Sequence, residues 1–184
     1  YSQTADHDPI PMTAAENGCR YADGVLDQQR QHLICIREDH SGSGEAVNTI
    51  VTVALGTGAE QILAQGQDFY SSPRLSPDGK QLSWISWNHP DMPWDGTTLW
   101  CAPLDEAGRL GEAQQIAGSR TEAVVQPEWS PDGQLYFVSD KTNWWNLYRW
   151  SPSGSTEAVC PRAAEFGLPH WVFRMSTYGF RAAD

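Results

Sequence analysis

Residues 127–150 read P-E-W-S-P-D-G-Q-L-Y-F-V-S-D-K-T-N-W-W-N-L-Y-R-W, and they decide how the rest of the chain is interpreted. Trp129 leads into the turn sequence at 130–133, and an apolar run typical of a β-strand follows at 135–138. A polar loop then precedes a second strand-like run at 147–150. The stretch therefore predicts the inner part of one antiparallel sheet.

The same motif occurs upstream, where residues 73–87 read P-R-L-S-P-D-G-K-Q-L-S-W-I-S-W. Proline presets φ for the first central position of a tight turn, Asp suits the second, and Gly supplies the positive φ that leads into the next strand. A single Ser-Pro-Asp-Gly is simply a common turn. Two copies followed by matching strands indicate an internal repeat.

A degenerate third copy of the turn is expected at residues 20–24, R-Y-A-D-G. Its Asp-Gly pair lies 55 positions before the pair at 78–79, which lies 54 positions before the pair at 132–133. Pro169-His170-Trp171 echoes Pro127-Glu128-Trp129, so a fourth copy is expected to begin at about 169. The predicted blades of this single partial domain, residues 1–184, are 19–72, 73–126 and 127–168, with partial blades at 1–18 and 169–184.

Each copy has room for four strands, and alternating apolar residues mark several of them. The predicted strands are 32–37, 49–55, 61–64, 72–75, 81–87, 98–102, 113–117, 126–129, 134–139, 146–150 and 157–160. Repeats of this length with four antiparallel strands are typical of a β-propeller, whereas a β-sandwich or a jelly roll would not restart with the same turn. The predicted fold class is all-β, a propeller segment of about three full blades plus parts of flanking ones, with almost no helix.

The amino-acid composition limits the classes of binding partner that are expected. The net charge is −11, and no basic patch suited to a phosphate backbone is visible, so no nucleic-acid partner is expected. No run approaches the roughly 18 apolar residues of a membrane helix, so no membrane association is expected.

The chain begins Tyr1-Ser2-Gln3 without a Met, and its true N-terminus is expected to lie elsewhere. The cytoplasm is the expected compartment. The four cysteines, Cys19, Cys35, Cys101 and Cys160, form no C-x-x-C pair and are predicted to be buried, reduced thiols rather than disulfides or metal ligands.

A family resemblance rests on longer motifs than the turn. They are R-E-D-H at 37–40, residues 69–79, W-N-H-P-D-M-P-W-D-G at 87–96, residues 126–140, W-W-N-L-Y-R at 144–149, E-F-G at 165–167 and W-V-F at 171–173. The repeats resemble the TolB-type, WD40-like propeller repeat. The longer motifs together resemble the N-terminal propeller of prolyl oligopeptidase family serine peptidases, in particular dipeptidyl aminopeptidases and acylaminoacyl-peptidases.

The resemblance implies a partner that this chain does not contain. Family members join the propeller to a C-terminal α/β-hydrolase domain whose Ser, Asp and His cleave peptide bonds. A nucleophile elbow needs G-x-S-x-G, and no such pentapeptide occurs among the 184 residues. We therefore assign no catalytic residue and no cofactor, and expect the chain to be inactive as a peptidase by itself.

The five histidines give no metal or catalytic pattern at ligand spacing, so surface or loop-packing roles are predicted for them. The loops between the second and third strands of each blade are more informative, because they are long and rich in Trp, His, Asp and Asn. In an antiparallel blade these loops share one face, opposite the Ser-Pro-Asp-Gly turns. The candidate contact residues there are Glu38, Asp39, His40, Asn88, His89, Asp91, Trp94, Asp95, Asp140, Asn143, Trp144 and Trp145.

We expect this face to meet the hydrolase domain or to line the chamber through which a peptide substrate reaches it. The alternative is that Trp94, Trp144 and Trp145 only cap the blade cores. Some family members grip the free amino terminus of a substrate with propeller glutamates, but no matching motif supports that role for Glu38.

Three blades do not close a seven- or eight-bladed ring, so open strand edges and apolar faces are expected at both ends. Residues 1–14 resemble outer strands of a preceding blade and residues 169–180 resemble inner strands of a following one, which makes self-association conceivable. Two functions are compatible with these features. The first is a non-catalytic propeller segment of a serine peptidase that gates peptide access. The second is a stand-alone TolB-like binding module for a protein or carbohydrate.

Overall fold

The computed structural model describes residues 1–3, 5–13 and 18–181, and within them it contains twelve strands and no helix. Within each sheet, strands that follow one another along the chain pair in antiparallel register. The strands are β1 (Cys19–Asp27), β2 (His32–Asp39), β3 (Val47–Ala54), β4 (Glu60–Ala64), β5 (Phe69–Leu75), β6 (Gln81–Trp87), β7 (Thr97–Pro103), β8 (Gln114–Ser119), β9 (Val124–Trp129), β10 (Leu135–Ser139), β11 (Asn146–Trp150) and β12 (Thr156–Ala158).

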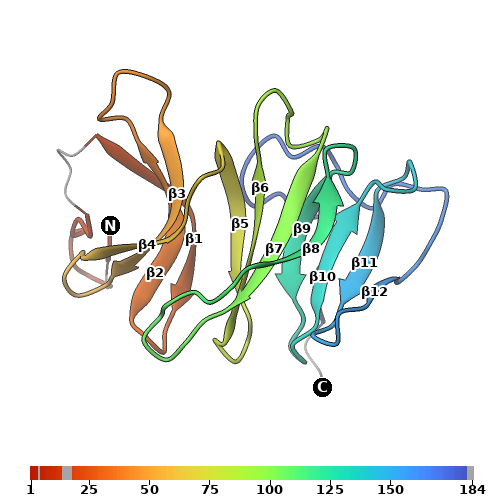
Figure 1. Ribbon diagram of the computed structural model, residues 1–184. Helices are drawn as coiled ribbons and strands as arrows, with labels where there is room; N and C mark the ends of the chain where they lie inside the picture. The colour runs from red at the N-terminus through yellow and green to blue at the C-terminus, as the bar shows by residue number, and fades with distance from the viewer. Residues whose placement is uncertain (4, 14–17, 182–184) are drawn as a thin grey trace.

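The strands form three four-stranded sheets that stand side by side (Figure 1). Blade 1 comprises β1–β4, blade 2 comprises β5–β8 and blade 3 comprises β9–β12. The first strands, β1, β5 and β9, contact one another in sequence and form the inner edge of the assembly. This arrangement confirms the predicted propeller segment of four-stranded blades.

The core lies between the blades. Ile34, Ile36 and Ile50 of blade 1 pack against Leu82 and Trp84 of blade 2, and all five are buried. These residues come from the alternating apolar positions of their strands, since one face of each sheet must bury its side chains against the next sheet.

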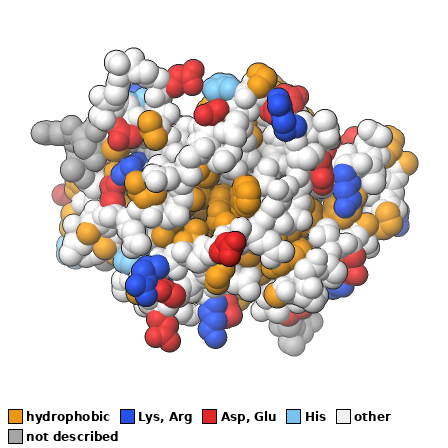
Figure 2. Space-filling view, viewed as in Figure 1, with side chains coloured by type: hydrophobic (Ala, Val, Ile, Leu, Met, Phe, Trp, Pro, Cys, Tyr) orange, Lys and Arg blue, Asp and Glu red, His pale blue; other side chains and the backbone are white. Residues whose placement is uncertain are grey.

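A second cluster joins blade 2 to blade 3, where Ile85 and Leu99 meet Val124, Leu135 and Phe137. Figure 2 shows hydrophobic side chains in a hollow at the middle of the view, with charged side chains scattered around it. A cavity between blades 1 and 2, lined by apolar residues that include Leu63, Trp84 and Trp100, marks where these two sheets diverge.

Each inner strand carries a β-bulge at the same place. Asp23, Ser72 and Gln126 have φ values of 50°, 54° and 49°, in the left-handed region that residues other than glycine seldom adopt. The strand register shifts at each of these positions. The position of the bulge therefore gives a more reliable alignment of the three blade sequences than the position of the turn does.

This alignment corrects one prediction. The pair Asp23-Gly24 is not a degenerate copy of the turn, because it lies inside β1 at the bulge. The turn of blade 1 is formed instead by residues 28–31, and Asp27 accepts a hydrogen bond from the Arg30 backbone N–H at 3.1 Å. Asp23 and Ser72 are 49 residues apart, so the first repeat is shorter than the predicted 55.

The breaks between sheets fall at residues 65–68 and 120–123, whereas the sequence placed the blade boundaries at 72/73 and 126/127. The difference arises because β5 and β9 each extend several residues before their proline. Proline lacks an N–H and was taken as the first residue of each blade, but here it occupies the bulge, where no ladder hydrogen bond is required.

The terminal segments contain no strand, contrary to the expected inner and outer strands of flanking blades. Among residues 1–3 and 5–13 there is only an isolated bridge between Ser2 and Ile10; Ala14, at the end of the predicted outer strands, lies outside the described residues. Residues 159–181 are irregular, and this C-terminal segment, blue in Figure 1, returns across the sheets as far as Gly24 in β1. Residues 182–184 of the predicted partial blade also lie outside the described part of the chain.

The C-terminal segment covers much of the apolar surface that was expected to be open. Phe180 contacts Tyr136 of blade 3, with ring centroids 5.0 Å apart, and Gly167 packs against Val138. Val138 is fully buried as a result. The exposed apolar face predicted at the end of blade 3 is thus partly closed by the chain itself.

No disulfide links the four cysteines, all of which lie in the described residues, and Cys35 and Cys101 are buried as predicted, whereas the predicted burial of Cys19 and Cys160 is wrong. Burial raises the pKa of both thiols to about 12. Cys19 and Cys160 are partly exposed. No helix that could span a membrane is present in residues 1–3, 5–13 and 18–181.

Candidate functional site

The antiparallel order of the blades places the β2–β3, β6–β7 and β10–β11 loops at one end of the molecule, at the top in Figure 1. The Ser-Pro-Asp-Gly turns at 76–79 and 130–133 lie at the opposite end. We call the first end the loop face. Its composition and its cavities make it the candidate site.

An aromatic cavity of about 460 Å³ lies at the loop end of β5 and β6. It is formed where the β6–β7 loop meets the returning C-terminal segment. The cavity is lined by Phe69, Ser71, Trp87, His89, Asp91, Met92, Pro93, Trp94, His170, Trp171, Val172 and Phe173.

Ring contacts organise the walls of this aromatic cavity. Phe69 stacks on Trp87 with centroids 5.3 Å apart, and His89 meets the same Phe69 ring edge-on at 4.9 Å. On the other side, Trp94 of the β6–β7 loop contacts Trp171 of the C-terminal segment at 4.4 Å. Such offset and edge-on pairs are favourable geometries for aromatic rings. The walls are therefore built by rings held against each other.

Two polar groups lie within this apolar lining. Ser71 is buried in β5, and its Oγ has no hydrogen-bond partner. His170 is 9% exposed, and burial lowers the pKa of its imidazole, with Arg74 lowering it further and Asp23 opposing the shift. The imidazole is consequently neutral at pH 7, with one nitrogen able to donate and the other able to accept.

The β6–β7 loop is fixed by local hydrogen bonds. Asp68 donates its backbone N–H to Asn88 Oδ1 at 2.7 Å and accepts the His89 N–H on Oδ2 at 2.9 Å. Asp95 Oδ2 accepts the Met92 N–H at 2.9 Å, which closes the turn that presents Trp94. Asn88 and Asp95 thus position the loop rather than line the aromatic cavity.

A second cleft, of about 660 Å³, lies between the loops of blades 1 and 2 and is lined partly by Glu38, His40, Glu45 and His89. His40 Nε2 lies 3.1 Å from Glu38, and His89 Nε2 lies 3.2 Å from Glu45. These pairs are ionic only when the histidines are protonated. Asp39 accepts a hydrogen bond from the Ser41 N–H at 2.9 Å. Hydrogen bonding with Ser41 lowers the pKa of the Asp39 carboxyl.

Asp91 lines both the aromatic cavity and a smaller depression beside it, of about 210 Å³. Its carboxylate lies 3.3 Å from the guanidinium of Arg120, which projects from the connection between blades 2 and 3. Because both groups are near the surface, this ion pair contributes little to stability, but it fixes the direction in which the carboxylate points.

The blade 3 candidates do not line the aromatic cavity, the second cleft or the depression beside Asp91. Asp140 accepts the Ala123 N–H at 2.8 Å, and the pKa of its carboxyl is raised by burial and by the neighbouring carboxylates of Glu122 and Glu165. Asn143 occupies a turn with φ of 61°, and its N–H reaches the Asp140 carbonyl at 2.7 Å.

The two adjacent tryptophans of blade 3 behave differently. Trp144 is 40% exposed, so it does not cap the blade core. Trp145 is partly buried, and its backbone N–H donates to Glu165 at 2.8 Å. The structure thus brings together the candidates of blades 1 and 2, and leaves those of blade 3 as a separate group.

Sequence reasoning did not find the members of the aromatic cavity that come from outside the three loops. They are Phe69, Ser71, Trp87, His170, Trp171, Val172 and Phe173. The W-V-F motif at 171–173 did stand out in the sequence, but it was assigned to an inner strand of a further blade. Its placement beside Trp94 depends on the path of the C-terminal segment, which has no periodic pattern.

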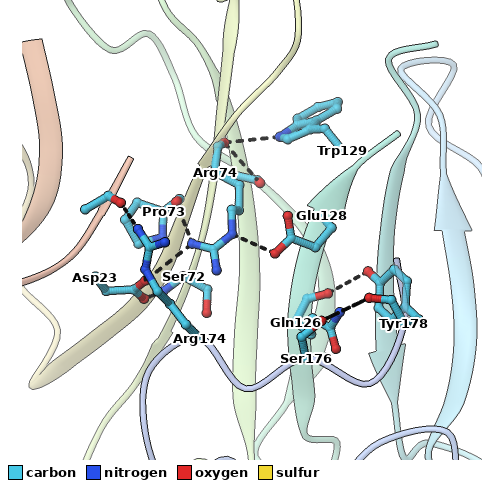
Figure 3. A network of polar contacts seen from close by, with 12 residues as sticks. Asp23, Ser72, Pro73, Arg74, Gln126, Glu128, Trp129, Arg174, Ser176 and Tyr178 are labelled. Carbon is cyan, nitrogen blue, oxygen red and sulfur yellow. Dashed lines mark hydrogen bonds and ion pairs between the residues drawn. The ribbon is translucent and has the colours of Figure 1, made fainter. Parts of the chain in front are cut away.

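A polar network occupies the inner edge of the blades (Figure 3). Asp23 of β1 accepts the Ser72 N–H at 2.6 Å and an Arg74 guanidinium N–H at 3.4 Å, while Arg74 Nε donates to Glu128 of β9 at 2.9 Å. The series of polar contacts that runs from Asp23 through Arg74 to Glu128 therefore links all three blades. Arg174 of the C-terminal segment adds an ion pair to Asp23 at 3.7 Å.

The same network anchors the C-terminal segment at blade 3. Gln126 Nε2 donates to the Tyr178 carbonyl at 2.8 Å, and Tyr178 OH donates back to the Gln126 carbonyl at 2.7 Å. The Thr177 N–H donates to Gln126 Oε1 at 2.7 Å. The left-handed bulge at Gln126 turns this side chain toward the segment, which is why the segment lies over the inner strands (Figure 3).

No group of three or more His, Cys, Asp or Glu side chains in the described residues is arranged to hold a metal ion. The chemistry that the loop face offers is recognition: an apolar aromatic cavity with one carboxylate, Asp91, in its lining, and a neighbouring cleft that contains Glu38 and Glu45.

No protein-family model and no curated protein matches the chain. Solved structures do match. A puromycin hydrolase is 38% identical over 91% of this chain, with a TM-score of 0.83. The chain is similar to a propeller region of puromycin hydrolase. A puromycin-hydrolyzing peptidase of Mycobacterium tuberculosis is 34% identical over 89% of the chain, with a TM-score of 0.81.

The puromycin hydrolase similarity extends over 27% of each of those two proteins, so this chain spans about a quarter of their length. TolB from Acinetobacter baumannii is 15% identical over 79% of this chain and 33% of its own, with a TM-score of 0.57, and shows the fold alone. A prolyl oligopeptidase shares the fold at a similar level. The predicted resemblance to the propellers of this peptidase family and of TolB is thereby confirmed.

Proposed function

We propose that this chain is a non-catalytic propeller segment of a serine peptidase, and that its loop face supports an α/β-hydrolase domain and controls the access of peptides to it. The observation that carries the proposal is the 38% identity to puromycin hydrolase over 91% of this chain. Identity at this level over nearly the whole chain favours a shared role as well as a shared fold.

The chemistry of the loop face supports a role in handling peptides. The aromatic cavity and the neighbouring cleft share His89, so they form one continuous recognition surface across blades 1 and 2. Aromatic anchors surrounded by polar groups are typical of surfaces that bind proteins and peptides. A mutant of puromycin hydrolase has been solved in complex with PGG.

The first test is the coding sequence that follows residue 184. We expect a G-x-S-x-G pentapeptide on a strand-to-helix turn downstream, followed by Asp and His. The chain expressed alone should show no peptidase activity. A complete reading frame without such an elbow would contradict the peptidase assignment.

The second test uses the full-length parent enzyme. Replacing His89 and Trp94 together with Ala should lower kcat/KM for peptides by about thirtyfold, the loss that corresponds to about 2 kcal/mol for a hot-spot contact, while the hydrolase domain stays associated. Glu106→Ala, an exposed change outside the cavity lining, is the control. Unchanged peptide kinetics with unchanged domain association would refute the role of this face.

A stand-alone TolB-like binding module is the competing function, and only a fold-level likeness supports it. Within the peptidase role, we propose that the parent acts as a dipeptidyl aminopeptidase or an acylaminoacyl-peptidase in the cytoplasm. Comparing hydrolysis of a free dipeptidyl and an N-acetyl-aminoacyl p-nitroanilide separates these two activities, and fractionation of the source cells tests the compartment.

A further inference from the structure

The C-terminal segment lies on the inner strands in the way that a bound peptide would. Gln126 Nε2 donates to the Tyr178 carbonyl at 2.8 Å, and Gln126 Oε1 accepts the Thr177 N–H at 2.7 Å (Figure 3). One carboxamide thus pairs with the backbone of two consecutive residues, a contact that recognises an extended main chain. Gln126 is 5% exposed and lies in the left-handed bulge of β9, so the strand sets its orientation.

Two side chains of the segment add selectivity to this backbone contact. The Tyr178 hydroxyl donates to the Gln126 carbonyl at 2.7 Å, and burial raises the pKa of this phenol, so it remains a donor at neutral pH. Four residues earlier, the Arg174 guanidinium donates to the Gly24 carbonyl and lies 3.7 Å from the buried carboxylate of Asp23. The inner strands therefore accommodate an arginine and a tyrosine at this spacing.

The rest of the segment is attached to the blades by few contacts. Residues 169–181 contain no strand, and no backbone–backbone hydrogen bond joins this described stretch to the blades. Between residues 171 and 180, all but Met175 and Tyr178 are exposed. Because no strand ladder has to break, the segment can leave the inner strands without unfolding a sheet.

The surface under the segment belongs to the three blades. We call it the inner groove, and it is formed by Asp23, Arg74, Gln126 and Glu128. Arg74 pairs with both Asp23 and Glu128, so the charges of the groove are held in place across β1, β5 and β9. A cavity of about 310 Å³ is lined on one side by Val25, Arg74 and Glu128 and on the other by residues 174–176.

We propose that the inner groove is a binding site for an extended peptide that carries an arginine four residues before a tyrosine, and that residues 174–178 of the chain itself occupy it. The seated segment is the evidence for the ligand, since it shows which contacts the groove makes. A peptide of this pattern binds when the segment leaves. The inference rests on the proposed function only for the source of the peptide.

An added peptide has to compete with the segment. A tethered segment acts at an effective concentration that is roughly millimolar, and the apparent Kd of a competitor rises as the unoccupied fraction of the site falls. Loosening the segment should therefore strengthen the binding of an added peptide. This gain in affinity is opposite to the loss that simple destabilisation of the fold would cause.

The test measures fluorescence anisotropy of an amidated peptide with the sequence of residues 174–180, R-M-S-T-Y-G-F, labelled at its N-terminus. Tyr178→Ala, which removes an anchor of the chain's own segment, should bind this peptide at least about tenfold more tightly than the wild-type chain. Arg174→Gln loosens the other end of the segment and should also increase the affinity. Circular dichroism establishes that each variant is folded. The Arg174 side chain is 63% exposed, so Arg174→Gln keeps the test decisive if Tyr178→Ala misfolds.

A second substitution in the loosened chain tests the groove itself. Gln126→Asn keeps a residue type that tolerates the left-handed backbone but withdraws the carboxamide by one methylene. It should weaken binding of the peptide about tenfold, through the loss of two hydrogen bonds. Gln28→Asn makes the same change at an exposed position in the turn of blade 1 and should leave the affinity unchanged. Exchanging the arginine and the tyrosine of the peptide keeps its composition and should abolish measurable binding.

The assignment would be overturned by any of four results: no saturable binding to a folded, loosened chain, no gain in affinity over the wild-type chain, equal binding of the exchanged peptide, or an unchanged affinity in Gln126→Asn. None of these measurements depends on hydrolysis. The groove can therefore fail while the full-length kinetics support the peptidase role, and a failure of those kinetics with intact peptide binding would count against the peptidase role only.

Discussion

At the scale of single residues, the buried carboxylate of Asp23 has the largest predicted effect on stability. Its side chain is completely buried, and it accepts the Ser72 N–H and an Arg74 N–H from the next blade. Removing the Asp23 carboxylate leaves the buried Ser72 N–H without its acceptor and takes from Arg74 one of its two carboxylate partners, since only Glu128 remains.

Asp23→Ala should therefore lower the free energy of unfolding by about 3–5 kcal/mol, measured by urea denaturation. Asp105→Ala, which breaks the exposed pair with Arg109, is the matched control and should barely move the midpoint. Similar losses for both variants would show that the inner network does not hold blades 1 and 2 together.

The buried imidazole of His170 gives the molecule a dependence on pH. Its pKa is lowered in the folded state, so the unfolded chain binds more protons as the pH falls below the ordinary histidine value of about 6.5. Its contribution is therefore fully present above that pH and is lost on acidification. The charges that face it are Asp23, which opposes the shift, and Arg74, which adds to it.

Between pH 7.5 and 5.5, the stability of the wild-type chain should fall more than that of His170→Gln, measured as urea midpoints. The comparison cancels the other four histidines, which are present in both proteins. Parallel curves for the two proteins would mean that His170 is as accessible to protons in the folded chain as in the unfolded one.

At the scale of the strand, the pairing of β7 with β8 depends on a glycine. Gly118 has φ of 91°, and a Cβ at this position would lie 2.0 Å from the Thr97 carbonyl oxygen. Neither the conformation nor the contact can be relieved by a side-chain movement, because the neighbour is backbone.

Gly118→Ala should consequently destabilise the protein by at least about 2 kcal/mol, and hydrogen exchange in β8 should accelerate. Gly42→Ala is the matched control, since a Cβ there meets nothing within 4 Å. A stability loss no greater than that of the control would show that β8 can move away from β7 at little cost.

At the scale of the whole molecule, thiol reactivity reports on global unfolding. Cys35 is buried with Val51 and Val53 in blade 1, and Cys101 belongs to the cluster that joins blade 2 to blade 3. Their pKa of about 12 leaves almost no thiolate at neutral pH. Cys19 and Cys160 are partly exposed.

A disulfide reagent at pH 8 should modify Cys19 and Cys160 of the native chain first, and should reach Cys35 and Cys101 only in proportion to the unfolded fraction. The rate at which Cys35 and Cys101 are modified should rise with urea concentration along the same curve as the loss of the circular dichroism signal. Rapid modification of all four thiols without urea would mean that the sheets separate in the native state.

The sequence alone determined the blade architecture, because its evidence is local: the Ser-Pro-Asp-Gly turns and the alternating strands appear in the order in which they pair. Two strands, β6 and β11, were located to the residue, at Gln81–Trp87 and Asn146–Trp150. The loop face was predictable too, since antiparallel order alternates the connections.

Only the tertiary structure decided where the blades begin and what forms the candidate site. The bulges at Asp23, Ser72 and Gln126 share no residue type, since a left-handed backbone can be imposed by packing and hydrogen bonds across blades. The aromatic cavity joins Trp94 to Trp171, which are held together by a segment without periodicity. Its path is set by Gln126, Asp23 and their partners, and contacts between such distant residues leave no pattern in the local sequence.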